Sequence, residues 1–156
     1  MEAKLRDFEP YFNRKYIALV VGYNLLTITL LSIYAFITGE TNEQGFNWPF
    51  TSDDFVKIVS ALVLAPFIEE FVFRKIPYSV AYQMGFSLKL TAIVSSLAWM
   101  SIHPFNSLGL FLNFVGGLFL FGLYHKYNSL LVNAFYHFLF NFTSIGIFVG
   151  FSYFNF

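Results

Sequence analysis

One short segment constrains this chain more than any other. It reads APFIEEFVFR at residues 65–74 and places two adjacent carboxylates, Glu69 and Glu70, and the guanidinium of Arg74 within a strongly apolar run. One charge at the centre of a bilayer costs about 2.5–3.5 kcal/mol on insertion scales, so three such groups on one helix cost about 8–10 kcal/mol by simple addition. Ionisable residues in membrane helices usually mark a functional site. The segment therefore predicts a membrane helix that carries a polar site.

The overall composition supports a membrane setting. Of the 156 residues, 57% are hydrophobic and 12% are charged, whereas a soluble domain has about 45–50% apolar and about 25% charged residues. The mean hydropathy is +0.62. The formal net charge is zero, so charge gives no indication of nucleic-acid binding. The absence of cysteine excludes disulfides, thiol catalysis and cysteine-ligated zinc.

The apolar stretches predict an all-α, polytopic membrane bundle of about five helices around a polar intramembrane cavity. Pro66 and Pro77 are expected to bend the second helix, and a turn at residues 85–87 is expected to end it. Residues 1–15 form a polar arm that we expect in the cytosol, and residues 16–156 form the bundle. The five predicted helices cover residues 16–38, 55–84, 89–103, 106–124 and 129–151.

The positions of lysine and arginine predict the orientation in the cell membrane. Four of these residues lie in the N-terminal arm, and none lies in the loop at residues 39–54. Lys75 and Lys89 flank the next turn, and Lys126 lies in a polar turn expected at residues 125–128. Basic residues favour cytosolic loops. The protein is therefore predicted to be multi-pass, with a cytosolic N-terminus and an external C-terminus.

Helical periodicity separates the three charges of the first segment. Glu70 and Arg74 are four residues apart and share a helix face, so they can pair. Glu69 points about 100° away and has no basic neighbour on its own helix. It is therefore the candidate general base.

The predicted hairpin gives Glu69 a partner. Glu69 precedes Gly85 by 16 residues, and His103 follows Gly85 by 18 residues. In two antiparallel helices that share this turn, both side chains lie at nearly the same depth. The alternative for His103 is a helix-end histidine beside Pro104 at the membrane surface.

The last helix carries a polar stripe that recurs every four residues and so lies on one face: Ser129, Asn133, His137 and Asn141. One interpretation is a ladder of hydrogen bonds between helices. Opposite the two glutamates, the stripe instead favours a shared hydrated cavity. Further candidates for the cavity lining are Trp99, Asn113 and Asn133.

The motifs narrow the chemistry. The chain lacks a phosphate-binding loop and the Ser-x-x-Lys, Gly-x-Ser-x-Gly and His-Glu-x-x-His patterns, which disfavours nucleotide chemistry, serine hydrolysis and zincin proteolysis. A water activated by Glu69 and His103 can attack a peptide bond, and His137 and Asn141 can donate to the developing oxyanion. Alternatively, Glu69, His103 and His137 bind a divalent metal that activates the water. No other cofactor is indicated.

Three motifs in this order resemble one known family. They are Glu69-Glu70-x-x-x-Arg74, Trp99-x-x-x-His103 and His137-x-x-x-Asn141, within about residues 60–145. The pattern is similar to that of the CAAX protease and bacteriocin-processing family, also called the Abi family, which includes the type II CAAX prenyl endopeptidases.

The resemblance implies an all-helical intramembrane bundle whose conical cavity opens to the cytosol. It assigns the catalytic glutamate to Glu69 and its water-activating partner to His103, without a metal. It also implies an oxyanion-stabilising pair, His137 and Asn141, and a supporting ion pair, Glu70 and Arg74.

The chain departs from the family pattern in three ways. Lys75 stands where the family usually has glycine, and Trp99 stands where it usually has phenylalanine. Many members also have more membrane helices than the five expected here. A homodimer is one way to supply the missing part of the cavity wall.

The resulting expectation is an intramembrane endopeptidase, a hydrolase surrounded by membrane lipids, that acts on a peptide or lipid-modified protein. Its role would be bacteriocin immunity or processing, or CAAX-type processing, and no nucleic acid is involved. One alternative is a non-catalytic membrane immunity or binding protein. A small transporter is the other, although five helices without an inverted repeat argue against it.

Overall fold

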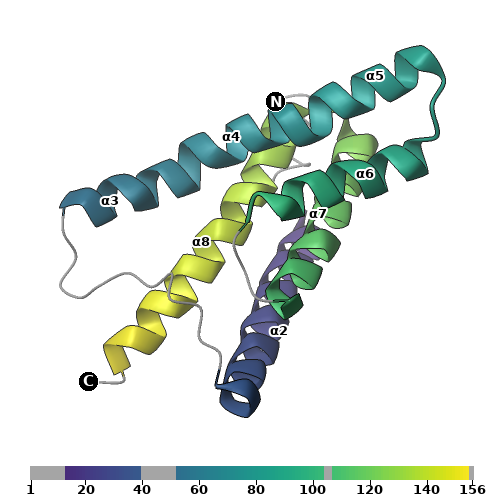
Figure 1. Cartoon of the computed structure of the whole chain (residues 1–156). Coiled ribbons are helices and arrows are strands. Elements are labelled where there is room, and N and C mark those ends of the chain that lie inside the picture. Colours follow the sequence, from purple (N-terminus) through teal and green to yellow (C-terminus); the bar gives the residue numbers. More distant parts are fainter. Residues whose placement is uncertain (1–12, 40–51, 104–106, 155–156) are drawn as a thin grey trace.

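A computed structural model describes residues 13–39, 52–103 and 107–154, and within these residues every regular element is helical. The predicted all-α class is therefore confirmed. Most of the predicted N-terminal arm and Pro104 lie outside the described residues. The elements, shown in Figure 1, are α2 (Arg14–Thr38), α3 (Ser52–Val59), η1 (Ser60–Leu64), α4 (Ala65–Glu70), η2 (Phe71–Lys75), α5 (Ile76–Met84), α6 (Leu88–Ser101), α7 (Ser107–Tyr127) and α8 (Leu130–Phe154).

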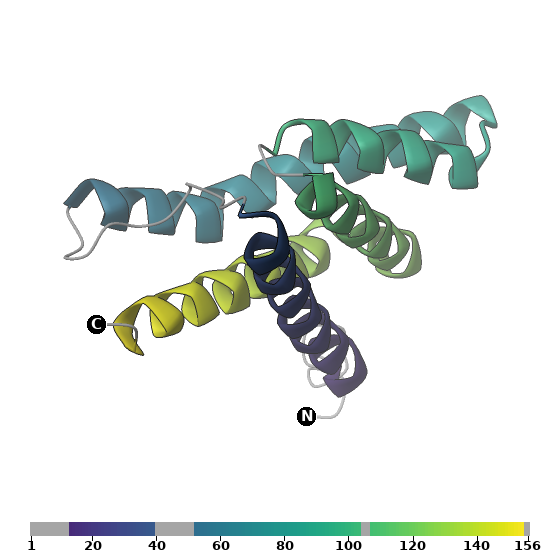
Figure 2. The same ribbon diagram turned by 60° about the horizontal axis from the view of Figure 1, so that its bottom comes forward.

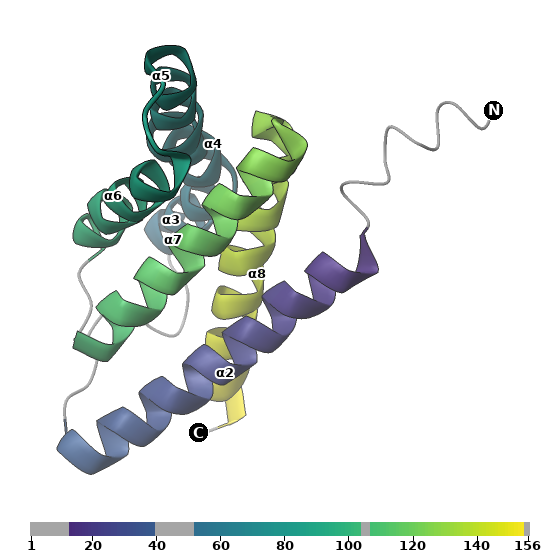
Figure 3. The same ribbon diagram turned by 90° about the vertical axis from the view of Figure 1, so that its right-hand side faces the viewer.

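The helices form two groups. The elements from α3 to α5 follow one another as a single long rod, and α6 returns beside its second half (Figure 1). The other group consists of α2, α7 and α8, which Figures 2 and 3 show crossing one another at open angles. The groups meet where α6 packs against α7 and where η1 and α4 pack against α8.

The long rod is interrupted by two π-helical turns, and each ends two residues before a proline. Pro66 and Pro77 are the second residues of α4 and α5. Proline has no N–H, and its ring clashes with the carbonyl four residues earlier. The preceding residues, Ala65 and Ile76, accordingly bond back five residues to Ser60 and Phe71, which is the π pattern. The predicted interruption at both prolines is confirmed in this form.

The predicted turn after the second helix is also confirmed. Gly85 ends α5 with φ 69°, a left-handed conformation that costs glycine little. Ser87 then caps α6, since its side chain accepts a hydrogen bond from the N–H of Leu90. The helix predicted to reach His103 ends at Ser101, and His103 closes it with a bond from its N–H to the Met100 carbonyl of 3.1 Å.

The polar turn predicted at residues 125–128 is wrong in its extent. Helix α7 continues through Tyr127, and the chain reverses at Asn128, whose φ of 47° is left-handed. Asparagine tolerates this conformation better than most residues. His125, interpreted as a loop residue, is therefore an exposed residue of the last helical turn, and its Nδ1 lies 3.2 Å from the hydroxyl of Tyr78.

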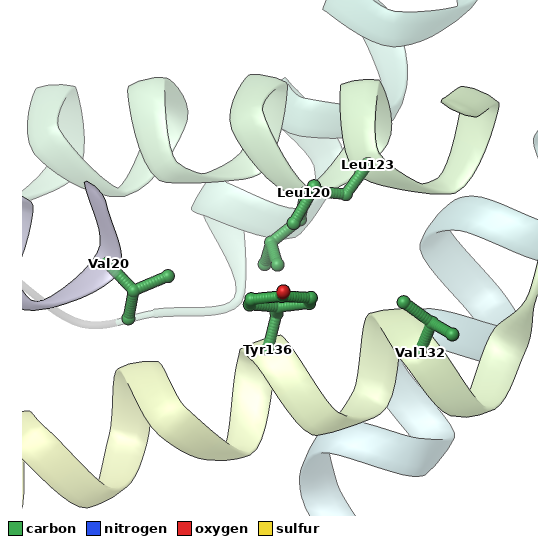
Figure 4. Packing of buried hydrophobic residues seen from close by; sticks show 5 residues of the cluster. All are labelled: Val20, Leu120, Leu123, Val132 and Tyr136. Carbon is green, nitrogen blue, oxygen red and sulfur yellow. The ribbon is translucent and has the colours of Figure 1, made fainter. Parts of the chain in front are cut away.

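A small apolar core joins α2, α7 and α8. It consists of Val20 from α2, Leu120 and Leu123 from α7, and Val132 and Tyr136 from α8 (Figure 4). In a lipid environment, such contacts stabilise helix association by van der Waals packing rather than by removal of apolar surface from water. This core fixes α8, and therefore the polar stripe of α8, relative to α7.

Among the described residues, two helices are long and apolar enough to cross a membrane. They are α2, with 25 residues and a hydropathy of 1.9, and α7, with 21 residues and a hydropathy of 1.7. Helix α6 and residues 130–145 of α8 are apolar but shorter. Large apolar side chains are exposed along α2 and the hairpin of α5 and α6, as expected for surfaces that face lipid. The fold is thus a helical membrane bundle, and the number of crossings stays a prediction.

Candidate active site

The charged segment lies at the end of α4, which packs against α8, and in η2, which packs against α6 and α7. Glu70 and Arg74 are completely buried, and Arg74 Nε lies 3.6 Å from Glu70 Oε2. The same carboxylate accepts hydrogen bonds from α8: Asn133 Nδ2 donates to Oε2, and His137 Nδ1 lies 2.8 Å from Oε1. Glu70 is therefore bound by its own helix and by two residues of the polar stripe.

The guanidinium of Arg74 lies close enough to the carboxylate of Glu70 to compensate its negative charge. Its Nη1 donates to the Phe73 carbonyl at 3.3 Å, and its guanidinium lies 5.1 Å from the ring centre of Trp99. Pro77 cannot donate to that carbonyl from the next turn, and Ser95 on α6 donates its hydroxyl there instead. The second π turn is thus joined to α6 at the level of the site.

Glu69 is the only one of the three charged residues whose side chain is partly exposed, at 18%. Its Oε2 accepts a hydrogen bond of 2.5 Å from the indole Nε1 of Trp99. The same oxygen lies 3.8 Å from Nε2 of His103 and 3.8 Å from Nε2 of His137. Residues from α4, the end of α6 and α8 therefore converge on one carboxylate.

Both imidazoles are oriented by bonds on the side away from Glu69. Nδ1 of His103 lies 2.9 Å from the carbonyl of Trp99, which can only accept, so this nitrogen carries the hydrogen. Nδ1 of His137 donates in the same way to Glu70. The Nε2 atoms face Oε2 of Glu69, where an imidazole nitrogen can exchange a proton with a neighbouring group. Their 3.8 Å distances exceed a direct hydrogen bond and allow a water to contact both partners.

Asn141 lies one helical turn beyond His137, where it bonds to the first π turn. Its Nδ2 donates to the carbonyl of Ala61 at 2.8 Å. This carbonyl lacks its usual donors, because Ala65 bonds to Ser60 and Pro66 has no N–H. Only one of the two amide hydrogens is needed for that bond, which leaves the second for another acceptor.

A cavity of about 360 Å³ between α2, α7 and α8 reaches the site, and its lining is largely apolar. Three site residues, Trp99, His137 and Asn141, lie in its wall, together with Asn113. Asn133, predicted as a lining residue, is not part of this wall. It is buried against Glu70 because the polar stripe faces α4 rather than the cavity at that turn.

Sequence reasoning missed the polar residues of α2. Asn24 donates to the Phe140 carbonyl at 3.2 Å and to the Thr143 hydroxyl, and accepts from Ser144 at 2.9 Å. The hydroxyl of Tyr23 donates to the carbonyl of Leu112. These bonds fasten α2 over the cavity. The available signal was a single amide in the middle of an apolar helix, which usually has a partner on a neighbouring helix.

Glu69, His103 and His137 are also the predicted alternative ligands of a divalent metal. Within the described residues, no group of three or more His, Asp or Glu side chains is arranged to hold a metal ion. The Glu69 oxygen that faces both imidazoles also accepts the N–H of Trp99, so a donor hydrogen points to the place where a cation would bind. The residues present instead suit proton transfer: one carboxylate, two oriented imidazoles and an amide at the end of a mostly apolar cavity.

Comparisons with known proteins identify the family. No curated protein and no solved structure matches the chain significantly. A family profile, described as type II CAAX prenyl endopeptidase Rce1-like, matches residues 51–143. This region is more than half of the chain and contains Glu69, His103, His137 and Asn141. By this match, which agrees with the helical membrane architecture, the chain belongs to the type II CAAX prenyl endopeptidase Rce1-like family.

Proposed function

We propose that this protein is an intramembrane endopeptidase that hydrolyses a peptide bond with a water activated by Glu69 and His103. One observation carries the proposal. Oε2 of Glu69 lies 3.8 Å from Nε2 of His103 and 3.8 Å from Nε2 of His137, although the three residues come from separate helical segments. Membership of the type II CAAX prenyl endopeptidase Rce1-like family supports the same reaction class.

The reaction begins with a water beside Glu69 and His103. Glu69 accepts a proton from this water, and the hydroxide forms a bond to the peptide carbonyl carbon, whose oxygen becomes an oxyanion. His137 and the second amide hydrogen of Asn141 donate to that oxygen. In this role His137 donates from Nε2, the ring nitrogen that lies 3.8 Å from Oε2 of Glu69.

The second half of the reaction returns the proton. As the carbon–nitrogen bond breaks, the leaving amine takes the proton that the water lost, delivered by Glu69 or through Nε2 of His103. The products are a carboxylic acid and an amine, which become a carboxylate and an ammonium once the acid proton passes to the amine, and the enzyme regains its starting state. No covalent intermediate with the protein is required.

The surroundings of the site favour an apolar substrate. The cavity that ends at Trp99, His137 and Asn141 is mostly apolar, and the bundle lies among membrane lipids. A hydrophobic peptide or a lipid-modified protein fits these conditions, with CAAX-type processing or bacteriocin immunity and processing as the roles. The predicted cytosolic N-terminus, external C-terminus and homodimer belong to the same proposal.

The test compares purified wild type with Glu69→Gln in proteoliposomes that contain a fluorogenic CAAX-type peptide, with and without a lipid group. General acid–base catalysis contributes about 10²- to 10⁴-fold, so we expect kcat/KM to fall by at least about 100-fold. Asp53→Asn is the matched control, because it makes the same kind of change at an exposed acid on α3. Equal rates for wild type and Glu69→Gln would refute the proposal.

The same variant distinguishes hydrolysis from a non-catalytic binding role. If a bacteriocin-resistance phenotype depends on hydrolysis, Glu69→Gln and His103→Ala abolish it while the proteins remain in the membrane at normal levels. Retention of the phenotype by both variants would support a non-catalytic immunity protein, and proton-coupled flux without cleavage would support a transporter.

A further inference from the structure

We propose that Trp99 is a positioning residue for Glu69, acting through its indole N–H. The inference rests on the proposed function. It gives Trp99 a role in that function through a hydrogen bond, in addition to the packing of its ring. The 2.5 Å bond from Trp99 Nε1 to Glu69 Oε2 is the shortest contact that Glu69 makes among the described residues. A phenylalanine would fill much of the same space but has no N–H to donate.

The indole is packed among several side chains of the site. Trp99 is 6% exposed, the guanidinium of Arg74 lies 5.1 Å from its ring centre, and the rings of His103 and His137 lie 4.6 Å and 5.6 Å away. On α7, Gly117 allows the close approach, since an added Cβ would lie 3.1 Å from Cε3 of the indole. The N–H therefore has a direction that the surrounding structure determines.

Glu69 needs such a restraint because it has no salt bridge comparable to that of Glu70. Its side chain has three rotatable bonds and is partly exposed. Each contact that the described residues make with its carboxylate, from Trp99, His103 and His137, is to Oε2. The bond to Oε2 restrains the carboxylate beside both imidazoles, where it can accept a proton from a water that contacts Glu69 and His103. A carboxylate held in this way keeps its basic oxygen in the reacting position.

The first arm of the test is kinetic. Trp99→Phe removes the donor and keeps an aromatic ring, and Trp48→Phe is the matched control, since Trp48 is the other tryptophan of the chain. We expect Trp99→Phe to lower kcat about tenfold while KM changes less than about twofold, because the lost bond orients the base rather than the substrate. Gly117→Ala, which displaces the ring without removing the N–H, should lower kcat in the same direction. An unchanged kcat in Trp99→Phe would overturn the proposal.

The second arm does not depend on activity. In a Trp48→Phe background, Trp99 gives the single indole N–H signal in a ¹⁵N–¹H NMR spectrum of the protein in nanodiscs. Glu69→Ala should move the indole proton upfield because it removes the acceptor, whereas Asp53→Asn should leave the signal in place. A signal that is unchanged by Glu69→Ala overturns the proposed bond.

The two arms separate the two proposals. A shifted indole signal in a protein that cleaves nothing would refute the proposed function alone and would support the bond between Trp99 and Glu69. Cleavage that depends on Glu69 but not on Trp99 would refute the positioning role alone. Circular dichroism and gel filtration establish that each variant retains its fold.

Discussion

His137 connects the two adjacent glutamates of the charged segment. Its Nδ1 lies 2.8 Å from Oε1 of the completely buried Glu70, and its Nε2 lies 3.8 Å from Oε2 of the partly exposed Glu69. One imidazole therefore faces a structural carboxylate on one side and the candidate base on the other. Since a charge change at Glu70 reaches the site through this ring, the network around Glu70 should affect both stability and turnover.

The first prediction concerns the buried ion pair. Glu70→Gln keeps an acceptor for His137 but leaves Arg74 buried without a counter-charge, so we expect the free energy of unfolding to fall by about 3–5 kcal/mol. Glu69→Gln is the matched control, and its cost should stay below about 1 kcal/mol because that side chain has no comparable cationic partner. Denaturant titration in detergent micelles measures both values. Equal losses for the two variants would contradict the assignment of Glu70 as the structural acid.

The second prediction separates two roles of Asn141. Asn141→Leu removes the bond to the otherwise unsatisfied Ala61 carbonyl, which should lower the unfolding free energy by about 1–3 kcal/mol. It also removes a donor to the oxyanion, which should lower kcat by about 10²- to 10³-fold. Steady-state kinetics on folded protein and denaturant titration measure the two effects separately. A loss of stability with normal kcat would restrict Asn141 to bracing the π turn.

The third prediction concerns the attachment of α2. Asn24→Leu removes the hydrogen bonds that join α2 to Phe140, Thr143 and Ser144 on α8. Interhelical bonds of this kind contribute about 0.6–2 kcal/mol each in membrane proteins, so we expect a measurable loss of thermal stability. Thr29→Val is the control, because the bond that the Thr29 hydroxyl makes among the described residues stays within its own helix, to the Leu25 carbonyl at 2.8 Å. A smaller effect for Asn24→Leu than for Thr29→Val would contradict the attachment of α2 to α8 through Asn24.

The fourth prediction concerns substrate size. Ile28→Trp adds volume to the wall of the 360 Å³ cavity, so it should raise KM for a peptide with a long apolar group more than for a short one. Ile33→Trp is the control, since Ile33 lies on the same helix with 51% of its surface exposed and is not part of the wall. Competition assays with both peptides measure the ratio. Equal ratios for the two variants would show that the cavity does not receive the substrate.

Several features of the fold depend on local sequence patterns. The turn at Gly85, the breaks before Pro66 and Pro77 and the spacing of Glu70 and Arg74 depend on residues within a few positions of one another, so sequence alone predicts them. The end of α7 was misplaced because a polar run can continue a helix as readily as it can form a turn. The polarity of residues 125–128 does not show which of them reverses the chain, and in the structure it is Asn128.

The sequence by itself determined the helical membrane fold, the buried charges and the candidates Glu69, His103, His137 and Asn141. Only the tertiary structure decided which atoms meet: Trp99 on Oε2 of Glu69, His137 between both glutamates, and Asn24 on α8. Contacts between helices depend on crossing angles and on the rotation of each helix about its axis. Each π turn changes that rotation because it contains more residues than a regular helical turn. The relative orientation of residues before and after η1 or η2 therefore cannot be calculated from a regular helical repeat.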